Sequence, residues 1–174
     1  MNTSLMTRCR RLLRHLWLDT HSVRRLLPKH SLDRLADQVW QSEARHRGEL
    51  RICVEASLPP LAVWRGLSAH QRAIDLFGQL RVWDTEHNNG VLIYLLVADR
   101  RIEILTDRGL TQLIPEATWQ ATVAHLGTLL QQGQFEPGLT DAIAQVGQVL
   151  AAHYPMPPGQ GRKANELPDA VVVI

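Results

Sequence analysis

Cysteine is scarce in this sequence of 174 residues, which contains only Cys9 and Cys53. Two cysteines cannot form the dense disulfide framework that stabilises many small secreted domains. Cys53 lies in the strand-like segment "RICVEA", and no phosphate-binding loop of the Cys-x5-Arg type follows it. We therefore expect a small buried side chain at this position rather than a nucleophile.

Long apolar runs are also absent. The longest, "VLIYLLVA" at residues 91–98, is far shorter than the roughly 20 residues that a membrane-spanning helix needs. The N-terminal segment is basic and has no continuous apolar core of about 7–15 residues, which a signal peptide requires. We therefore expect a cytoplasmic protein, peripheral to the inner membrane if its N-terminal segment binds there.

Three common catalytic signatures are missing: a glycine-rich loop ending in Lys-Ser/Thr, a Gly-x-Ser-x-Gly motif and a His-Glu-x-x-His motif. The net charge of +2 is unevenly distributed, because residues 1–30 hold seven basic side chains and one acidic one. A nucleic-acid-binding domain would spread positive charge over a folded face and offer aromatic stacking positions. The sequence shows neither feature, so no nucleic-acid partner is expected.

Residues 1–30 predict a basic amphipathic helical arm. Apolar side chains recur in it at helical spacing, with arginines between them: Leu5, Cys9, Leu12, Leu13, Leu16 and Trp17. We expect this stripe to pack on the parent domain while the arginines face water. The alternative is that residues 1–27 bind an anionic membrane surface or a membrane-protein partner.

Residues 31–155 predict one α/β domain. Ser31 is the expected N-cap of a helix that Gly48 ends. Three strands are then expected, with one long helix from the prolines at 59 and 60 to about residue 80: residues 49–55, 91–98 and 101–107. Two further helices should follow, with Gly133 and Pro137 as the break between them. Residues 156–174 form a Pro/Gly-rich tail that we expect to be mostly loose, although its last four residues could join a sheet edge.

Only Asp99 and Arg100 separate the second and third strands, so these should form an antiparallel hairpin. Folding about that pair would place Ile93 opposite Thr106. The first strand reaches the second through a helix, which predicts a right-handed parallel crossover. The polar clusters "DTEHNNG" and "TDRG", which flank the hairpin in sequence, should therefore meet at one end of the sheet.

The expected cluster has carboxylate and amide oxygens, which are the ligands that Ca²⁺ or Mg²⁺ prefers. The predicted metal ligands are Glu49, Asp84, Asn88, Asn89 and Asp107. The alternative is purely structural: "HNNG" is then a tight turn and Asp107 a helix cap. The opposite end of the sheet, with Glu55, Ser57, Asp99 and Arg100, is a second candidate site.

The sequence resembles the TPM-domain family, named after a thylakoid lumen protein, a photosystem II repair protein and a nematode receptor modulator. The resemblance rests on "GELRICVE", "RAIDLFGQLRVWDTEHNNGVLIYLLVADRRIEILTDRGL", "PEATWQ", "FEPGLTDAIAQVGQVLAAHYP" and the later "NELPD". It covers about residues 31–155, and this version is similar to the bacterial cytoplasmic branch. The resemblance implies an αβα sandwich around a mixed, mostly four-stranded sheet.

The resemblance also implies binding of a divalent cation and a phosphatase activity. Asn88 and Asn89 stand where secreted relatives often have an acidic pair, which lowers the local negative charge. We therefore expect a cation-binding module that assists membrane-associated complexes. The alternative is a metal-assisted phosphomonoesterase of low activity, in which Asp107 helps to hold the cation and Arg108 contacts phosphate oxygens.

Overall fold

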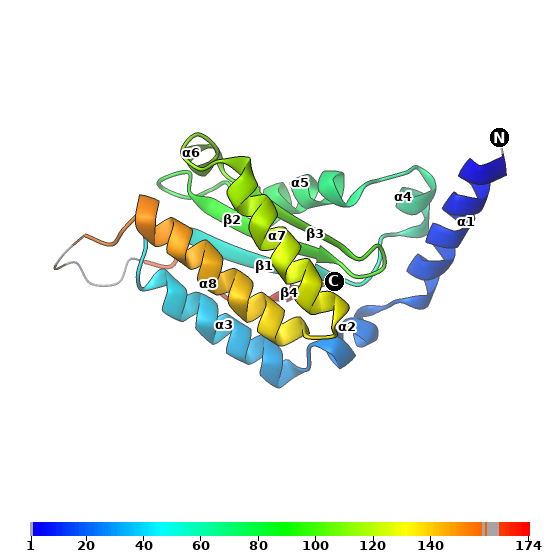
Figure 1. Ribbon diagram of the computed structural model, residues 1–174, viewed down its shortest axis with the longest axis horizontal. Coiled ribbons are helices and arrows are strands. Elements are labelled where there is room, and N and C mark those ends of the chain that lie inside the picture. Colours follow the sequence, from blue (N-terminus) through cyan, green and yellow to red (C-terminus); the bar gives the residue numbers. More distant parts are fainter. Residues whose placement is uncertain (1, 158, 160–163) are drawn as a thin grey trace.

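The computed structural model describes residues 2–157, 159 and 164–174 (Figure 1). The helices are α1 (Asn2–Trp17), α2 (Thr20–Leu26), α3 (Lys29–Glu43), α4 (Pro60–Trp64), α5 (Ala69–Gln79), α6 (Arg108–Thr111), α7 (Glu116–Gln131) and α8 (Phe135–His153). The strands are β1 (Glu49–Glu55), β2 (Gly90–Leu96), β3 (Arg101–Thr106) and β4 (Val172–Val173).

The four strands form one mixed sheet in the order β3-β2-β1-β4. β1 runs parallel to β2 and to β4, whereas β2 and β3 are antiparallel. This confirms the expected α/β class and the four-stranded sheet, with the fourth strand supplied by the end of the chain. The parallel step from β1 to β2 passes through α4 and α5, as the crossover argument predicts.

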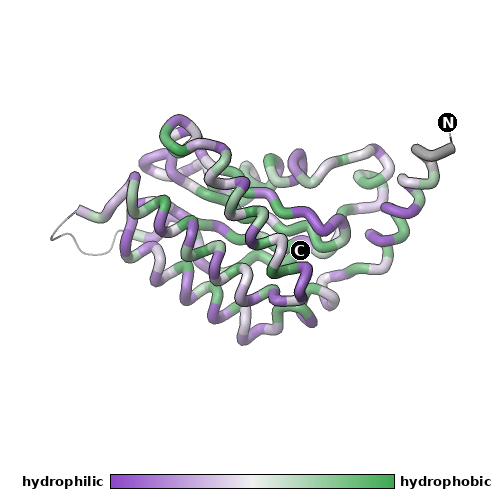
Figure 2. Tube along the Cα trace, in the orientation of Figure 1, coloured by the Kyte–Doolittle hydropathy of each residue, from purple (hydrophilic) through white to green (hydrophobic). Residues whose placement is uncertain are grey.

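Helices cover both faces of the sheet, which makes the molecule an αβα sandwich (Figure 1). Alternate residues of β2 point to opposite faces, so Ile93 packs into the core beneath α3, α7 and α8, while Tyr94 packs into the core beneath α4 and α5. Figure 2 shows hydrophobic residues along the central strands and alternating hydropathy along α3 and α8. This alternation is typical of helices that bury one side.

Three predicted helix boundaries are wrong for identifiable reasons. The extended backbone of Pro28 starts α3 at Lys29, so Ser31 lies inside the helix instead of capping it. The helix predicted from residue 60 is split, because Gly66 takes a φ of 82° and Ser68 forms a capping box with Gln71 that begins α5. Pro137, expected to break a helix, lies in the first turn of α8, where a missing N–H costs nothing.

The hairpin register differs from the prediction by two residues. Thr106 lies opposite Val91, and Ile93 lies opposite Ile104. The connection has four residues, 97–100, because Val97 still donates its N–H to the Glu55 carbonyl of β1 at 2.9 Å. A shift of two keeps every side chain on its predicted face, so the core is unaffected.

The described part of the tail is packed rather than loose. Arg51 of β1 donates hydrogen bonds to the carbonyl oxygens of Pro168 and Ala170. Leu167 is 5% exposed, and β4 pairs with Cys53 and Val54. The expectation of a loose tail therefore fails for residues 164–170, and for residues 158 and 160–163 it lies outside the described residues. The expectation that the last four residues join a sheet edge is confirmed by β4.

Helix α1 packs against α4 at one end of the molecule (Figure 1). The prediction that its apolar stripe packs on the domain is wrong for most of the stripe, because Leu13, Leu16 and Trp17 are 57%, 59% and 84% exposed. Leu12 is half-buried, and the side chain of Leu5 lies outside the described part of the chain. Within that part, no helix combines the length and apolarity needed to cross a bilayer.

Candidate functional site

The two polar clusters meet at the end of the sheet where β1 and β2 begin and β3 ends. Glu49 is paired with Gly90 across the parallel strands. Asp107 donates its backbone N–H to the Gly90 carbonyl at 2.9 Å, and Gly109 donates to the Asn88 carbonyl at 3.0 Å. The predicted contact between the clusters is thus confirmed, although the roles predicted for their side chains stay predictions.

Local sequence explains why the loop before β2 folds so tightly. Asn88 has a φ of 50°, a left-handed conformation that asparagine tolerates better than most residues. Thr85 accepts the backbone N–H of Asn89 through its hydroxyl at 3.1 Å. A side chain at Gly90 would place its Cβ 2.0 Å from the Val82 carbonyl oxygen, so only glycine allows this approach.

Arg108 and Asn88 join the two clusters through their side chains. Arg108 donates from Nε and Nη2 to Asn88 Oδ1, both at 3.2 Å. The adjacent Gly109 is enclosed, since a Cβ there would lie 2.6 Å from the Asn88 carbonyl oxygen and 2.8 Å from the Tyr154 hydroxyl. The amide oxygen predicted to bind a cation therefore already accepts hydrogen bonds from a guanidinium group.

Glu49 lies at the predicted end of the sheet and is fully buried. Its two carboxylate oxygens accept the backbone N–H groups of Glu166 and Leu167 in the tail, each at 3.3 Å. The tail reaches the loop as well, because Glu166 Oε2 accepts the N–H of Glu86 at 2.8 Å. Through these hydrogen bonds Glu49 holds the tail next to the polar clusters. The motif "NELPD" is the one feature of the sequence that points to this contact.

Asn89 and Asp107 each keep one buried side-chain oxygen without a hydrogen-bond partner. Asn89 Nδ2 donates to the Arg47 carbonyl at 3.0 Å, whereas its Oδ1 has no partner in the described structure. Asp107 Oδ1 accepts the N–H of Arg108 at 2.7 Å and caps α6, whereas its Oδ2 has none. Buried oxygens of this kind are uncommon and call for a water, a proton or a cation.

Sheet geometry separates these two oxygens. Asp107 lies opposite Gly90 and donates a backbone hydrogen bond to it. Residues opposite one another in a sheet point to the same face, so Asp107 belongs to the face on which Gly90 packs against Val82. Asn89 precedes Gly90 and points to the other face, where it meets Arg47. Asp84 lies in the loop that follows Val82 and is exposed.

The donor set decides which metal sites this end of the sheet can form. In the described parts of the chain, no three or more His, Cys, Asp and Glu side chains are grouped so that they could hold a metal ion. The available oxygens, one carboxylate oxygen of Asp107 and nearby loop oxygens, fit a hard cation that retains much of its water, as Mg²⁺ commonly does. They do not fit a closed protein cage.

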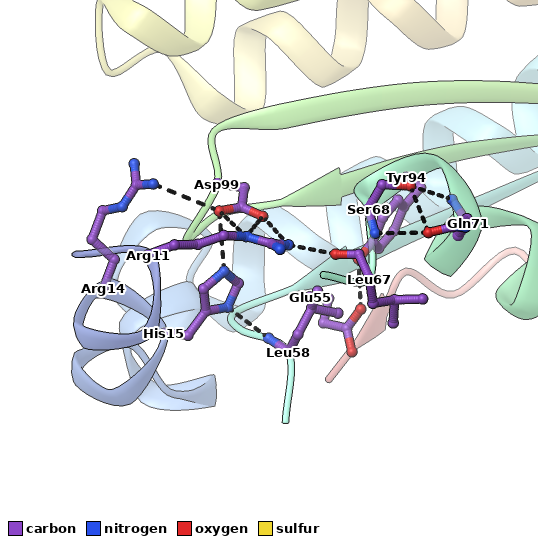
Figure 3. Close-up of polar contacts among 10 residues, drawn as sticks. All are labelled: Arg11, Arg14, His15, Glu55, Leu58, Leu67, Ser68, Gln71, Tyr94 and Asp99. Atoms are coloured by element: carbon purple, nitrogen blue, oxygen red, sulfur yellow. Dashed lines mark hydrogen bonds and ion pairs between the residues drawn. The ribbon is translucent and has the colours of Figure 1, made fainter. Parts of the chain in front are cut away.

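The opposite end of the sheet was the second candidate site, and its carboxylates are all bonded. Glu55 accepts from Arg72 Nη2 at 2.9 Å and from the Tyr94 hydroxyl at 2.6 Å. Burial, followed by the hydrogen bond to Glu55, raises the pKa of Tyr94. Figure 3 shows Asp99 surrounded by Arg11, Arg14 and His15 of α1. These contacts join elements of the fold and engage the carboxylates of both Glu55 and Asp99.

A cavity of about 610 Å³ lies between the hairpin connection and α7, at the same end of the sheet as Arg100 of the second candidate site. Ile102, Leu130 and Phe135 give it an apolar lining, and Arg100 and Arg101 are the charged residues among those that line it. None of the described residues that line it is a carboxylate.

The mixed sheet and its covering helices define an αβα sandwich whose two polar clusters meet where β1 and β2 begin and β3 ends. The TPM domain matches residues 24–149, and the chain belongs to the TPM-domain family. Among solved structures it is similar to the BA42 protein of the psychrophilic bacterium Bizionia argentinensis, determined by NMR. The two are 27% identical with a TM-score of 0.73, over 84% of this chain and 94% of BA42. No curated protein matches the sequence.

Proposed function

We propose that the chain is a divalent-cation-binding module and that Asp107 is its principal ligand. The observation that carries the proposal is Asp107 Oδ2, a buried carboxylate oxygen with no hydrogen-bond partner in the described structure. An unpaired buried oxygen of this kind costs about 1–3 kcal/mol, more when it is charged, and a bound cation would remove this cost. Ca²⁺ and Mg²⁺ suit oxygen ligands and are the expected ions.

The surrounding contacts predict weak binding. Arg108 bonds Asn88 Oδ1, so a cation near this oxygen must either displace the guanidinium group or bind beside a positive charge. Glu49 is engaged by the tail, which leaves Asp84 as the further carboxylate of the predicted set in the loop before β2. Two carboxylates and water give fewer charged ligands than a high-affinity calcium site uses.

We infer that such a module works without catalysis, as a cation-responsive part of a membrane-associated assembly in the bacterial cytoplasm. The similarity to a bacterial protein supports the bacterial branch of the family. A cation on Asp107 would link the loop before β2 to the end of β3, and both segments lie at the protein surface beside the tail. Binding would therefore change the surface that the module offers to a partner.

Cation titration with thermal unfolding tests the proposal. Because a ligand that binds only the folded chain stabilises it, Ca²⁺ or Mg²⁺ at about 100 times the dissociation constant should add about 2.7 kcal/mol. Asp107→Asn should remove the shift while keeping an N-cap residue for α6. Asp141→Asn, at an exposed carboxylate on α8, is the matched control and should keep it. An unfolding temperature of the wild type that neither cation changes would refute the proposal.

A metal-assisted phosphomonoesterase is the second candidate, and one observation favours it. The Arg108 side chain is exposed next to Asp107, where a fork of N–H donors can meet phosphate oxygens. A bound cation would polarise water and neutralise phosphate charge. Turnover of a chromogenic aryl phosphate should then need the cation, vanish in Asp107→Asn and fall strongly in Arg108→Lys. Equal turnover in Asp107→Asn would identify a contaminating enzyme.

A further inference from the structure

Helix α1 presents an apolar stripe to solvent. Its exposed members are spaced three, four, three and one residues apart, which puts them on one side of the helix: Met6, Cys9, Leu13, Leu16 and Trp17. Met6 is 73% exposed and Trp17 is 84% exposed, and Trp17 exceeds every other tryptophan, of which Trp83 at 53% is the next most exposed. A continuous row of five exposed side chains of this kind on one side of a helix is typical of an interaction surface.

The opposite side of α1 holds the helix on the domain through polar contacts. Arg11 Nη2 donates to Asp99 Oδ2 at 2.7 Å and to the Leu67 carbonyl at 2.6 Å (Figure 3). His15 Nδ1 accepts the N–H of Leu58 at 2.9 Å, so its Nε2 carries the proton that is shared with Asp99 at 3.1 Å. These anchors fix the rotation of α1 and direct its apolar stripe away from the domain.

The charge of α1 identifies what the stripe can meet. The helix contains no acidic residue, and Arg10 and Arg14, four residues apart, follow one edge of the stripe. Arg14 is 52% exposed and lies 3.9 Å from Asp99, a distance that leaves most of its donors free. A helix with an apolar face, flanking arginines and a tryptophan suits the interface of a membrane that contains anionic lipids.

We propose that the outward stripe of α1 docks on an anionic phospholipid surface. Leu13, Leu16 and Trp17 enter the boundary between headgroups and acyl chains, and Arg10 and Arg14 bind lipid phosphates. A second copy of the chain fits this stripe less well, since pairing two α1 helices would bring their arginines together with no acidic residue on either helix to neutralise them. The proposal does not depend on cation binding at Asp107.

Flotation of the full chain with vesicles tests this docking. The protein should float with vesicles of phosphatidylcholine mixed with phosphatidylglycerol and stay behind with phosphatidylcholine alone. Trp17→Ser and Leu13→Ser should each weaken the binding by roughly tenfold, as the loss of a large buried apolar group predicts. Arg10→Gln with Arg14→Gln and higher salt should weaken it too. Leu61→Ser, at an exposed leucine on α4, is the control and should bind as the wild type does.

Cys9 gives a second measurement on the wild-type chain, which needs no substitution. This cysteine lies within the stripe and is exposed, so a water-soluble thiol reagent should modify it quickly. Anionic vesicles should protect it, and phosphatidylcholine vesicles should not. The proposal is overturned if anionic vesicles neither float the chain nor protect Cys9. It is equally overturned if Trp17→Ser converts a dimer into a monomer in the absence of vesicles, because a second copy then covers the stripe.

Discussion

Arg11 of α1 donates from Nε and Nη2 to Asp99, 88 residues later in the chain, at distances of 2.7–3.2 Å. Asp99 lies in the connection of the β2–β3 hairpin, so this ion pair joins the N-terminal helix to one end of the sheet. Both side chains are largely shielded, with exposures of 20% and 11%, which makes the pair stronger than a solvent-exposed one.

Arg11→Ala should release α1 without unfolding the domain. The substitution removes every bond between this guanidinium group and Asp99, and hydrogen bonds to charged groups contribute about 1.5–3 kcal/mol. The amide hydrogens of residues 2–17 should then exchange faster, while those of β1 and β2 should be unchanged. Arg10→Ala, which removes an exposed arginine from the same helix, is the matched control. Exchange that is the same in both variants would show that Arg11 does not hold α1.

Acid should release the same helix. Burial alone would raise the pKa of Asp99, but hydrogen bonds from Arg11 and His15 outweigh it and hold this pKa below its ordinary value of 3.8. A depressed carboxyl pKa stabilises the docked state above the ordinary value, and the stabilisation is lost as the pH falls through the lower folded value. Exchange of the α1 amides should therefore accelerate below about pH 3.8, and Asp99→Asn should abolish this pH dependence.

Gly90→Ala should destabilise the chain strongly. The added Cβ would meet the Val82 carbonyl oxygen at 2.0 Å, and a backbone atom cannot rotate out of the way. Overpacking costs about 1–3 kcal/mol, and this contact belongs at the upper end of that range. Gly78→Ala in α5 is the control, because its Cβ meets nothing within 4 Å and should stabilise the helix by about 0.5–1 kcal/mol. Denaturant unfolding should separate the two variants in opposite directions.

The two thiols should react at very different rates. Cys9 is exposed, whereas burial, helped by the charge of Glu55, raises the pKa of Cys53 to about 12. A coloured thiol reagent should titrate one group quickly in the folded chain, and Cys9→Ser should remove that fast phase. Above pH 9.0, the ordinary pKa, the Cys53 thiol loses its proton in the unfolded chain but keeps it in the folded chain. A rise in pH above this value should therefore favour unfolding. Two fast thiols in the native chain would contradict the burial of Cys53.

The sequence predicts the central β2–β3 hairpin well, because a hairpin is determined by residues that are close together in the sequence. The apolar run at 91–98 and the short gap before residue 101 required a hairpin, and the expected meeting of Asn88 with Arg108 follows from it. The two-residue error in register arose because Val97 continues its bond to β1, a long-range contact that no local pattern reveals.

The periphery was harder to predict, since its contacts pair side chains with distant backbone. Nothing near Glu49 indicates that its carboxylate binds the tail, 117 residues later. Helical periodicity correctly predicted an amphipathic α1, but it could not tell which side of the helix faces the domain. Arg11 and His15 decide that, because their polar anchors to Asp99 exclude the apolar stripe from the interface.

The tail should contribute to stability through Glu49 and Arg51. Deleting residues 164–174 removes the N–H donors of Glu49 and the carbonyl acceptors of Arg51, and it exposes the edge of β1 that β4 covers. Two buried charged groups then lose hydrogen-bond partners, at about 1–3 kcal/mol each, so the unfolding temperature should fall by several degrees. Asn165→Ala is the control, since Asn165 is exposed and donates one hydrogen bond to Asp169 at 3.0 Å, whose loss should cost little. An unchanged unfolding temperature after the deletion would show that the tail is not part of the folded unit.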